Sequence, residues 1–122
     1  MAKALGLGGV FFTSPDPRAL LAWYQRHLGF AASPEAGVAF LPAAMPANAY
    51  TVWSAFPAST RYFDPSSRGF MINLVVDDLD AALAQVRNGG AIIVGAVESF
   101  DNGRFGWFVD PDGNKVELWE PR

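Results

Sequence analysis

The sequence predicts an α+β fold in which two βαβββ modules (strand, helix, then about three strands) lie side by side. The chain has 122 residues, of which 51% are apolar and 17% charged, so it has the size and apolar content of one folded domain. Its capping and turn signals recur at half the chain length: 62 positions separate Asp16 from Asp78, and 61 separate Gly29 from Gly90. This spacing indicates an internal duplication. Two such modules would form a cupped antiparallel sheet with the helices on its outer face.

The first half contains the elements of one module. Residues 7–13 are apolar and rich in aromatic side chains, which predicts a strand. Asp16 then starts a helix as its N-cap, and Gly29 suits the left-handed residue that ends it. Residues 38–41 and 50–56 follow as predicted strands. Four apolar side chains at helical spacing form the buried stripe of the helix: Leu20, Trp23, Tyr24 and Leu28.

The second half repeats this order. Residues 70–76 are a predicted strand, and Asp78 caps a helix that ends at Gly89 and Gly90. Three further strands are predicted at 91–97, 104–109 and 115–119. The last two are joined by the Asp-Pro-Asp-Gly-Asn sequence at 110–114, which strongly favours a turn.

Composition excludes several classes of function. The net charge is −3 and the chain contains no basic run, so nucleic acid is not an expected partner. It has no cysteine, which excludes disulfides and thiolate metal sites. Its apolar stretches are shorter than the ~20 residues that span a bilayer, and the glycines near the N-terminus argue for a strand there and against a signal peptide. We therefore expect a soluble, cytoplasmic protein without a membrane partner.

Four segments carry a family resemblance: GGVFFTSPDP at 8–17, AWYQRHLGF at 22–30, FMINLVVDDLD at 70–80 and FGWFVDPDGNKVELWEP at 105–121. In this order and spacing they resemble the vicinal oxygen chelate superfamily, which includes glyoxalase I, bleomycin-resistance proteins and extradiol dioxygenases. The resemblance implies one glyoxalase/bleomycin-resistance-like domain over 5–121, with modules at 5–58 and 68–120 and a linker at 59–67. It also implies a homodimer, for which side-by-side and exchanged arrangements both remain open.

The resemblance also implies where metal ligands would lie. Metal-binding members carry ligands on the first and last strand of each module, and the matching positions here are Gly9, Met71, a position near Trp53, and Glu117. Only Glu117 can hold a divalent ion. Composition agrees, because zinc prefers Cys or His and the single histidine lies at a predicted helix end. We therefore predict a member that lacks most metal ligands, with no tightly bound metal and no cofactor, and the sequence leaves open a weakly bound metal at Glu117.

Glu117 is the candidate catalytic or ligand-orienting residue. A turn at 110–114 places Trp107 opposite Glu117, and Lys115 lies on the same face two residues away. A carboxylate among apolar neighbours needs a partner, so Glu117 either forms a salt bridge with Lys115 or Arg104, accepts a backbone donor, or acts on a ligand. The residues expected to line the cleft with it are Phe11, Thr13, Trp53, Met71, Asn73, Trp107 and Trp119. Each apolar member of this set could equally belong to the core.

Three functions are consistent with these residues. The first is a metal-free protein that binds a small aromatic or amphipathic molecule, similar to bleomycin-resistance proteins. The second is a lyase or isomerase of the glyoxalase type that acts on a small carbonyl compound, with Glu117 as its base or metal ligand. The third is a protein without a small ligand, whose cup is filled by its own side chains. The sequence leaves open whether the protein is an enzyme.

Overall fold

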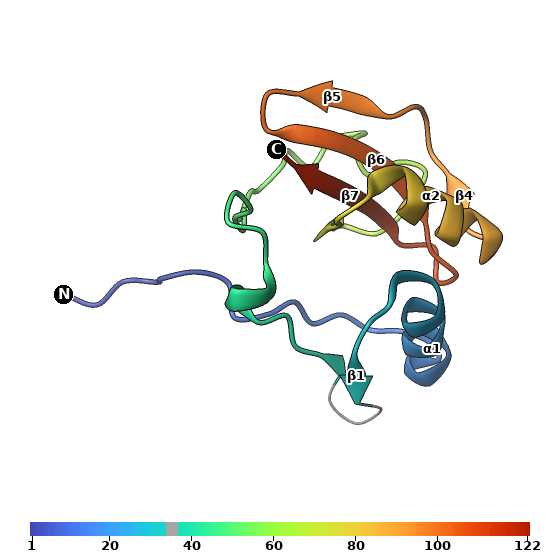
Figure 1. The fold of residues 1–122 in the computed structure, drawn as a ribbon, viewed down its shortest axis with the longest axis horizontal. Helices are drawn as coiled ribbons and strands as arrows, with labels where there is room; N and C mark the ends of the chain where they lie inside the picture. Colours follow the sequence, from blue (N-terminus) through green and yellow to red (C-terminus); the bar gives the residue numbers. More distant parts are fainter. Residues whose placement is uncertain (34–36) are drawn as a thin grey trace.

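The structure, a computed structural model, describes residues 1–33 and 37–122. These residues form two α-helices, a 3-10 turn, a small two-stranded sheet and a mixed five-stranded sheet, which together make an α+β fold (Figure 1). The small sheet pairs β1 (Ala32–Ser33) with β2 (Gly37–Val38), and the 3-10 turn η1 spans Pro42–Ala44. The predicted fold class is confirmed.

The five-stranded sheet is built from the second half of the chain. Its strands are ordered β3 (Ile72–Val75), β7 (Lys115–Pro121), β6 (Gly103–Val109) and β4 (Ile92–Ile93), and β5 (Glu98–Phe100) also pairs with β6. β3 runs parallel to β7, whereas the other pairs are antiparallel. The expectation of an antiparallel sheet is therefore wrong in this respect. A helix follows β3, and a helical crossover is the connection that allows parallel strands.

Both helices begin and end at the predicted signals. α1 (Pro17–Leu28) has Asp16 as its N-cap, whose carboxylate accepts from the Ala19 amide at 3.1 Å. α2 (Leu79–Asn88) begins in the same way, because Asp78 accepts from the Ala81 amide at 3.0 Å. Side chains at these positions accept hydrogen bonds from amides that the helix itself leaves unpaired. Gly29 ends α1 with a φ of 67°, in the left-handed region that glycine tolerates.

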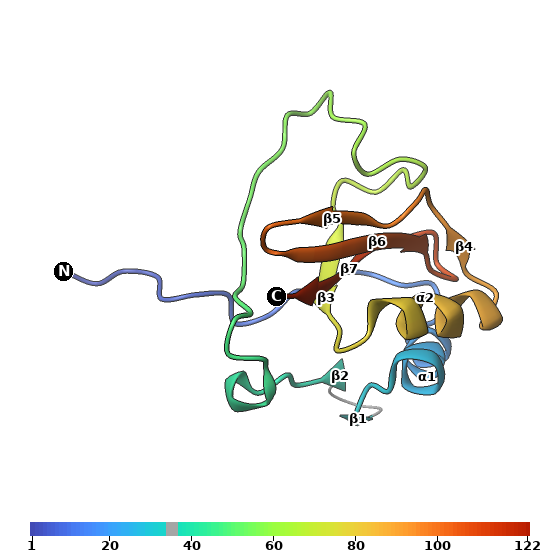
Figure 2. The ribbon, with the colours of Figure 1, turned by 45° about the horizontal axis from the view of Figure 1, so that its top comes forward.

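The core lies between the two helices and one face of the sheet. Figure 2 shows α1 and α2 next to each other along one side of the strands, as expected for helices on the outer face. Apolar side chains from both helices meet those of β6 and β7, and this burial is the main stabilising contribution to the fold. The buried cluster consists of Leu20, Tyr24, Leu79, Ala82, Val86, Phe108, Val116 and Leu118.

The first half does not form the strands that its sequence predicts. Residues 7–13 and 50–56 have no strand pairing, and only Gly37–Val38 forms near the predicted strand at 38–41. The N-terminal segment extends away from the rest of the molecule (Figure 1). A strand requires a neighbour for its backbone hydrogen bonds, and these segments have none among the residues that the structure describes. The equal pair of strand-rich modules is therefore not formed within one chain, and the module boundaries stay a prediction.

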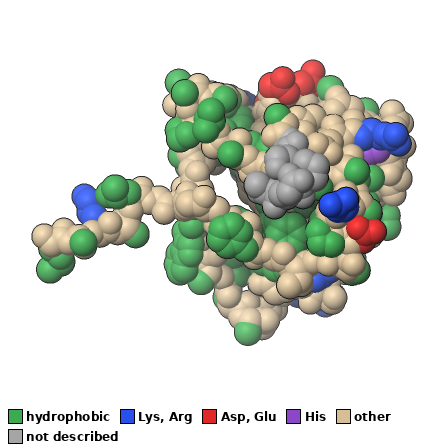
Figure 3. Space-filling model, turned by 90° about the horizontal axis from the view of Figure 1, so that it is seen from below, with side chains coloured by type: hydrophobic (Ala, Val, Ile, Leu, Met, Phe, Trp, Pro, Cys, Tyr) green, Lys and Arg blue, Asp and Glu red, His purple; other side chains and the backbone are tan. Residues whose placement is uncertain are grey.

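Many large apolar side chains of the first half are consequently exposed. Phe11 is 96% exposed and Trp53 is 78% exposed. Hydrophobic side chains, green in Figure 3, gather on the part of the molecule from which the N-terminal segment extends. Among the residues that the structure describes, no helix combines the length and apolar character needed to cross a bilayer.

Candidate functional site

Glu117 lies on the central strand of the sheet, between two strands that supply its neighbours. β6 pairs Trp107 opposite Glu117, as the predicted turn requires. β3 pairs Asn73 with Glu117 from the other side. Directly paired residues on one face are close enough for their side chains to interact. The pairing of β3 and β7 thus brings together residues 44 positions apart in the sequence.

The Glu117 carboxylate accepts three hydrogen bonds from neutral side chains. Asn73 Nδ2 donates to Oε1 at 2.7 Å, and Trp107 Nε1 donates to Oε2 at 2.8 Å. The hydroxyl of Tyr62 also donates to Oε2, at 2.5 Å. Hydrogen bonds to an ionised acceptor are shorter and stronger than those between neutral groups. The carboxylate is therefore held in place by three side chains from three parts of the chain.

Tyr62 comes from the linker and was not among the predicted site residues. Its ring stacks on Phe56 with centroids 5.8 Å apart and an angle of 3° between the planes. Burial raises the pKa of Tyr62 above its ordinary value, and the hydrogen bond to Glu117 and the charge of that carboxylate add to the effect. A linker tyrosine has no periodic pattern that would reveal its partner. The only signal in the sequence is the aromatic pair Tyr62–Phe63 in an otherwise polar stretch.

Lys115 contacts the site without forming the expected salt bridge. Its Nζ donates to the backbone carbonyl of Tyr62 at 2.6 Å and lies 5.0 Å from the centre of the Tyr62 ring. Among the described residues, no carboxylate oxygen lies within 4.0 Å of this ammonium group. Arg104, the other candidate partner of Glu117, pairs with Asp80 at 2.9 Å. The proposed salt bridge of Glu117 is therefore replaced by neutral donors.

Four other predicted site residues make no hydrogen bond to the Glu117 carboxylate. Trp119 lies two residues further along β7, where its Nε1 donates to the Asn102 carbonyl at 2.9 Å and its ring stacks on Phe105. Phe11, Thr13 and Trp53 are exposed on segments that form no strand. None of these four is among the described side chains that donate to Glu117. Their assignment to a binding cleft stays a prediction.

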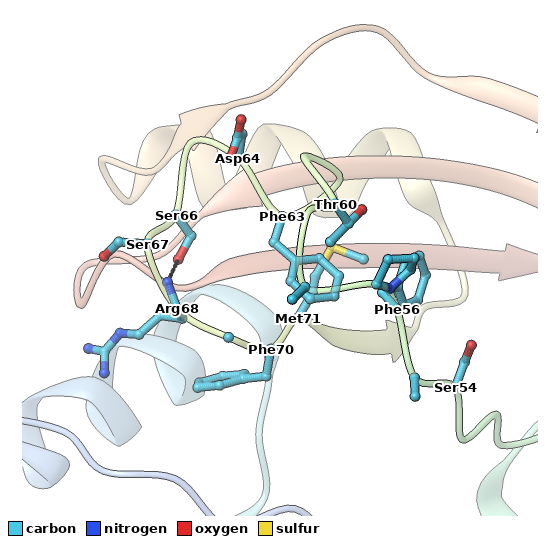
Figure 4. A pocket seen from close by; sticks show the side chains of 14 residues that line it. Ser54, Phe56, Thr60, Phe63, Asp64, Ser66, Ser67, Arg68, Phe70 and Met71 are labelled. Carbon is cyan, nitrogen blue, oxygen red and sulfur yellow. Dashed lines mark hydrogen bonds between the residues drawn. The ribbon is translucent and has the colours of Figure 1, made fainter.

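Met71 lines a large cavity whose lining residues all lie between positions 54 and 71, partly in the linker and partly on either side of it (Figure 4). The cavity has a volume of about 670 Å³, within the range of roughly 300–1,000 Å³ typical of ligand sites. Figure 4 shows Phe56, Phe63 and Met71 gathered on one side, with Phe70 and Arg68 on the other. Ser66 lies beside them and accepts from the Arg68 amide at 3.1 Å. The cavity thus offers aromatic and sulfur surfaces with a few polar groups.

A second, smaller cleft lies directly beside the Glu117 cluster. Its volume is about 190 Å³, and Tyr62, Trp107 and Lys115 form one part of its lining. Val94, Ala96 and Glu98 form another part. The two cavities have no lining residue in common.

A comparison with known families identifies the family of this chain. The family model described as a glyoxalase-like domain matches residues 9–119, which is nearly the whole chain. The chain belongs to the glyoxalase-like domain family. The resemblance to the vicinal oxygen chelate superfamily, seen first in the sequence, is thereby confirmed. No curated protein matches the glyoxalase-like chain.

Several solved structures are similar to parts of this glyoxalase-like domain. TnmS3, an antibiotic binding protein from Streptomyces sp. CB03234, is 33% identical over 44% of this chain and 45% of its own, with a TM-score of 0.39. A member of the glyoxalase/bleomycin resistance protein/dioxygenase superfamily from Sphaerobacter thermophilus DSM 20745 is 34% identical over 40% of each chain, with a TM-score of 0.37. The matched regions therefore span less than half the length of these two proteins.

The metal site known in the wider superfamily does not fit the residues around Glu117 here. Among the described residues, no three His, Asp or Glu side chains gather in a metal-binding arrangement. The groups that face the carboxylate are N–H and O–H donors, and the indole nitrogen of Trp107 can only donate. A divalent cation needs several acceptor ligands. The residues around Glu117 therefore form a hydrogen-bonded carboxylate and not a set of metal ligands.

Proposed function

We propose that this glyoxalase-like protein binds a small aromatic or amphipathic molecule without a metal ion. The observation that carries the proposal is the Glu117 carboxylate, whose oxygens are engaged by Tyr62, Asn73 and Trp107. Glu117 is the one implied metal-ligand position that carries a carboxylate, and here that carboxylate accepts the hydrogen bonds of its neighbours. Recognition would then depend on apolar surface and a few polar contacts, as in most small-molecule sites.

The larger cavity is the site that we assign to this ligand. Its aromatic side chains Phe56 and Phe63 lie 5.2 Å apart between ring centres and give flat apolar contact area. Aromatic walls favour ring-containing ligands through offset or edge contacts. Thr60 and Arg68 supply polar groups at the same cavity. An amphipathic molecule matches this combination of surfaces.

The alternative function, a lyase or isomerase with Glu117 as its base, has weaker support. A general base must be free to take a proton from a substrate within hydrogen-bond reach. Protonation of Glu117 would remove acceptor capacity that Tyr62 and Trp107 now use. The network therefore favours a carboxylate that positions its neighbours.

A thermal-shift screen tests the proposal. Aromatic, amphipathic and antibiotic compounds would be screened with and without a chelator, and ligands should raise the melting temperature equally in both conditions. Met71→Trp places a bulky ring in the larger cavity and should weaken the shift produced by the same ligands. Ala84→Trp, on the exposed face of α2, is the matched control and should keep it.

Two results would contradict the proposal. One is stabilisation that requires added metal, together with a stoichiometric ion found by elemental analysis that disappears in Glu117→Gln. The other is an equal ligand response in wild type and Met71→Trp, which would place the ligand elsewhere.

We also infer that the protein acts as a homodimer. A compact monomer of 13.2 kDa has an accessible surface of about 6,400 Å², whereas this chain exposes 8382 Å². The excess of about 2,000 Å² per chain would be about 4,000 Å² for two chains, within the range of roughly 2,000–5,000 Å² that obligate homodimers bury. Exposed apolar residues such as Phe11 and Trp53 account for part of it. Sedimentation equilibrium should give twice the chain mass, and a monomer at all concentrations would refute this inference.

A further inference from the structure

The smaller cleft beside Glu117 is lined by a cation, Lys115, whose ammonium group makes one hydrogen bond to the described residues. Lys115 is 6% exposed, and its Nζ donates one hydrogen bond, to the Tyr62 carbonyl. An ammonium group has three donors, and in the described part of the chain no carboxylate oxygen lies within ion-pair distance of this one. Burial lowers the pKa of Lys115, against the opposing influence of Glu117 and Asp64. Besides this hydrogen bond, the described contacts of the ammonium are the rings of Tyr62 and Trp107, whose centres lie 5.0 and 6.0 Å from Nζ.

The same cleft also contains an anion that has no ion pair within the described residues. Glu98 lies on β5 and is exposed at the edge of the cleft. Its negative charge is among the influences that raise the pKa of Tyr62, so it is electrostatically close to that phenol. Lys115 and Glu98 therefore present opposite charges to one cleft without pairing with each other.

We propose that this cleft binds a small zwitterion, such as an α-amino acid, with its carboxylate toward Lys115 and its ammonium toward Glu98. A simple anion would meet Glu98 and, at longer range, Glu117 and Asp64. A simple cation would meet the ammonium of Lys115. A molecule that carries both charges a few bonds apart complements both side chains, and it leaves the net charge of the cleft unchanged.

The apolar residues that line the cleft determine the size and type of the uncharged part of this ligand. Tyr62 and Trp107 present rings at 82° to each other, with centres 6.3 Å apart. Val94 and Ala96 add aliphatic surface. The volume of about 190 Å³ equals that of about six liquid waters at roughly 30 Å³ each. This space suits one apolar side chain or ring together with its charged groups.

A series of three probes with the same phenyl body tests the proposal on the intact protein. L-Phenylalanine carries both charges, 3-phenylpropanoate lacks the ammonium, and 2-phenylethylamine lacks the carboxylate. Titrations followed by the indole N–H signal of Trp107 in NMR spectra should show phenylalanine binding about tenfold more tightly than either analogue, equivalent to about 1.4 kcal/mol. Equal affinity for the three probes, or no shift with phenylalanine, would overturn the proposal.

Charge-removing variants test the orientation of the ligand. Lys115→Met should remove the preference for phenylalanine over phenylethylamine and keep the preference over phenylpropanoate. Glu98→Gln should have the reverse effect. Lys3→Met is the matched control, since Lys3 is the other lysine of the chain and is exposed near the N-terminus. If either charge-removing variant lowered the affinity for all three probes equally, the assignment of the two charges would be contradicted.

Two further comparisons make this test independent of whether Lys115→Met folds and of the proposal for the larger cavity. Glu98→Gln changes an exposed side chain, so it decides the question even if Lys115→Met fails to fold. Met71→Trp, which narrows the larger cavity, should leave phenylalanine binding unchanged because Met71 does not line the smaller cleft. Loss of phenylalanine binding in Met71→Trp would refute a separate site, and failure of the zwitterion series would leave the proposal for the larger cavity standing.

Discussion

The hydroxyl of Tyr24 donates a 2.8 Å hydrogen bond to Oδ2 of Asp110, between α1 and the turn that joins β6 to β7. Both residues are buried. The Asp110 carboxylate also accepts from the amides of Asp112 and Asn114 and from the Asn114 side chain. One carboxylate thus organises the turn and attaches it to a helix from the other half of the chain.

Tyr24→Phe should destabilise the protein by about 1–2 kcal/mol. The variant removes one hydrogen bond to a charged acceptor, and Asn114 still donates to the same oxygen, so the acceptor is not left unpaired. Urea denaturation measures the change. Tyr50→Phe is the control, because Tyr50 is exposed and its hydroxyl accepts only from Asn102 in the described contacts. Loss of this hydroxyl should change the free energy of unfolding little. Equal effects of the two variants would contradict this role of Tyr24.

Stability should decrease as the pH rises above about 10. Burial is the main cause that raises the pKa values of Tyr24 and Tyr62 above the ordinary 10.0. In that range the unfolded chain loses phenolic protons that the folded chain retains, so the free energy of unfolding falls with pH. Lys115 acts in the opposite direction, because its lowered pKa makes the unfolded chain bind more protons just below 10.5.

Thermal melts of wild type and Tyr24→Phe between about pH 9 and 11 check this expectation. The variant should lose less stability over this range than wild type. A wild-type melting temperature that does not change with alkaline pH would contradict the prediction.

Glu117→Gln should cost about 1–3 kcal/mol of stability. The amide is neutral, and one of its two positions becomes an N–H group that faces the donors of Tyr62, Trp107 or Asn73. The loss is limited because part of this cluster is accessible to water. Chemical denaturation measures it, with Glu98→Gln as a matched strand glutamate that should change stability by less than about 0.5 kcal/mol. A Glu117→Gln protein as stable as wild type would show that the network contributes little.

Gly103→Ala should destabilise the sheet by at least about 2 kcal/mol. Gly103 has a φ of 140°, and an added methyl group would collide with the Glu120 carbonyl and lie 2.6 Å from Nε1 of Trp119. Gly113 also has a positive φ, of 84°, but open space around it. Gly113→Ala should therefore show the backbone strain alone, about 1 kcal/mol. The difference between the melting temperatures of Gly103→Ala and Gly113→Ala measures the cost of the collision at Gly103. Equal melting temperatures would contradict a collision there.

Local signals explain what could be predicted from the sequence. The caps Asp16 and Asp78, the glycine at 29 and the turn at 110–114 each act through neighbouring backbone groups, so they are visible in a short stretch of residues. The turn also determined the register of β6 and β7, which placed Trp107 opposite Glu117. The family resemblance depended on the order of these same signals.

Partners that are distant in the sequence explain what could not be predicted. Tyr62 meets Glu117 across 55 positions from a linker without periodicity. The strands expected at 7–13 and 50–56 have suitable residues, but strand formation depends on a neighbour that the sequence does not specify. Glu117 was expected to pair with Lys115 or Arg104, but three neutral donors surround it. The absence of a metal or cofactor, the homodimer and the cytoplasmic location stay predictions.

The position of β7 in the sheet has a consequence for biosynthesis. This strand lies between β3 and β6, although it follows both in the chain. Until residues 115–121 leave the ribosome, β3 has no parallel neighbour, and the nascent chain exposes an incomplete sheet. Ribosome-bound intermediates that end before residue 115 would therefore be targets for chaperones and proteases.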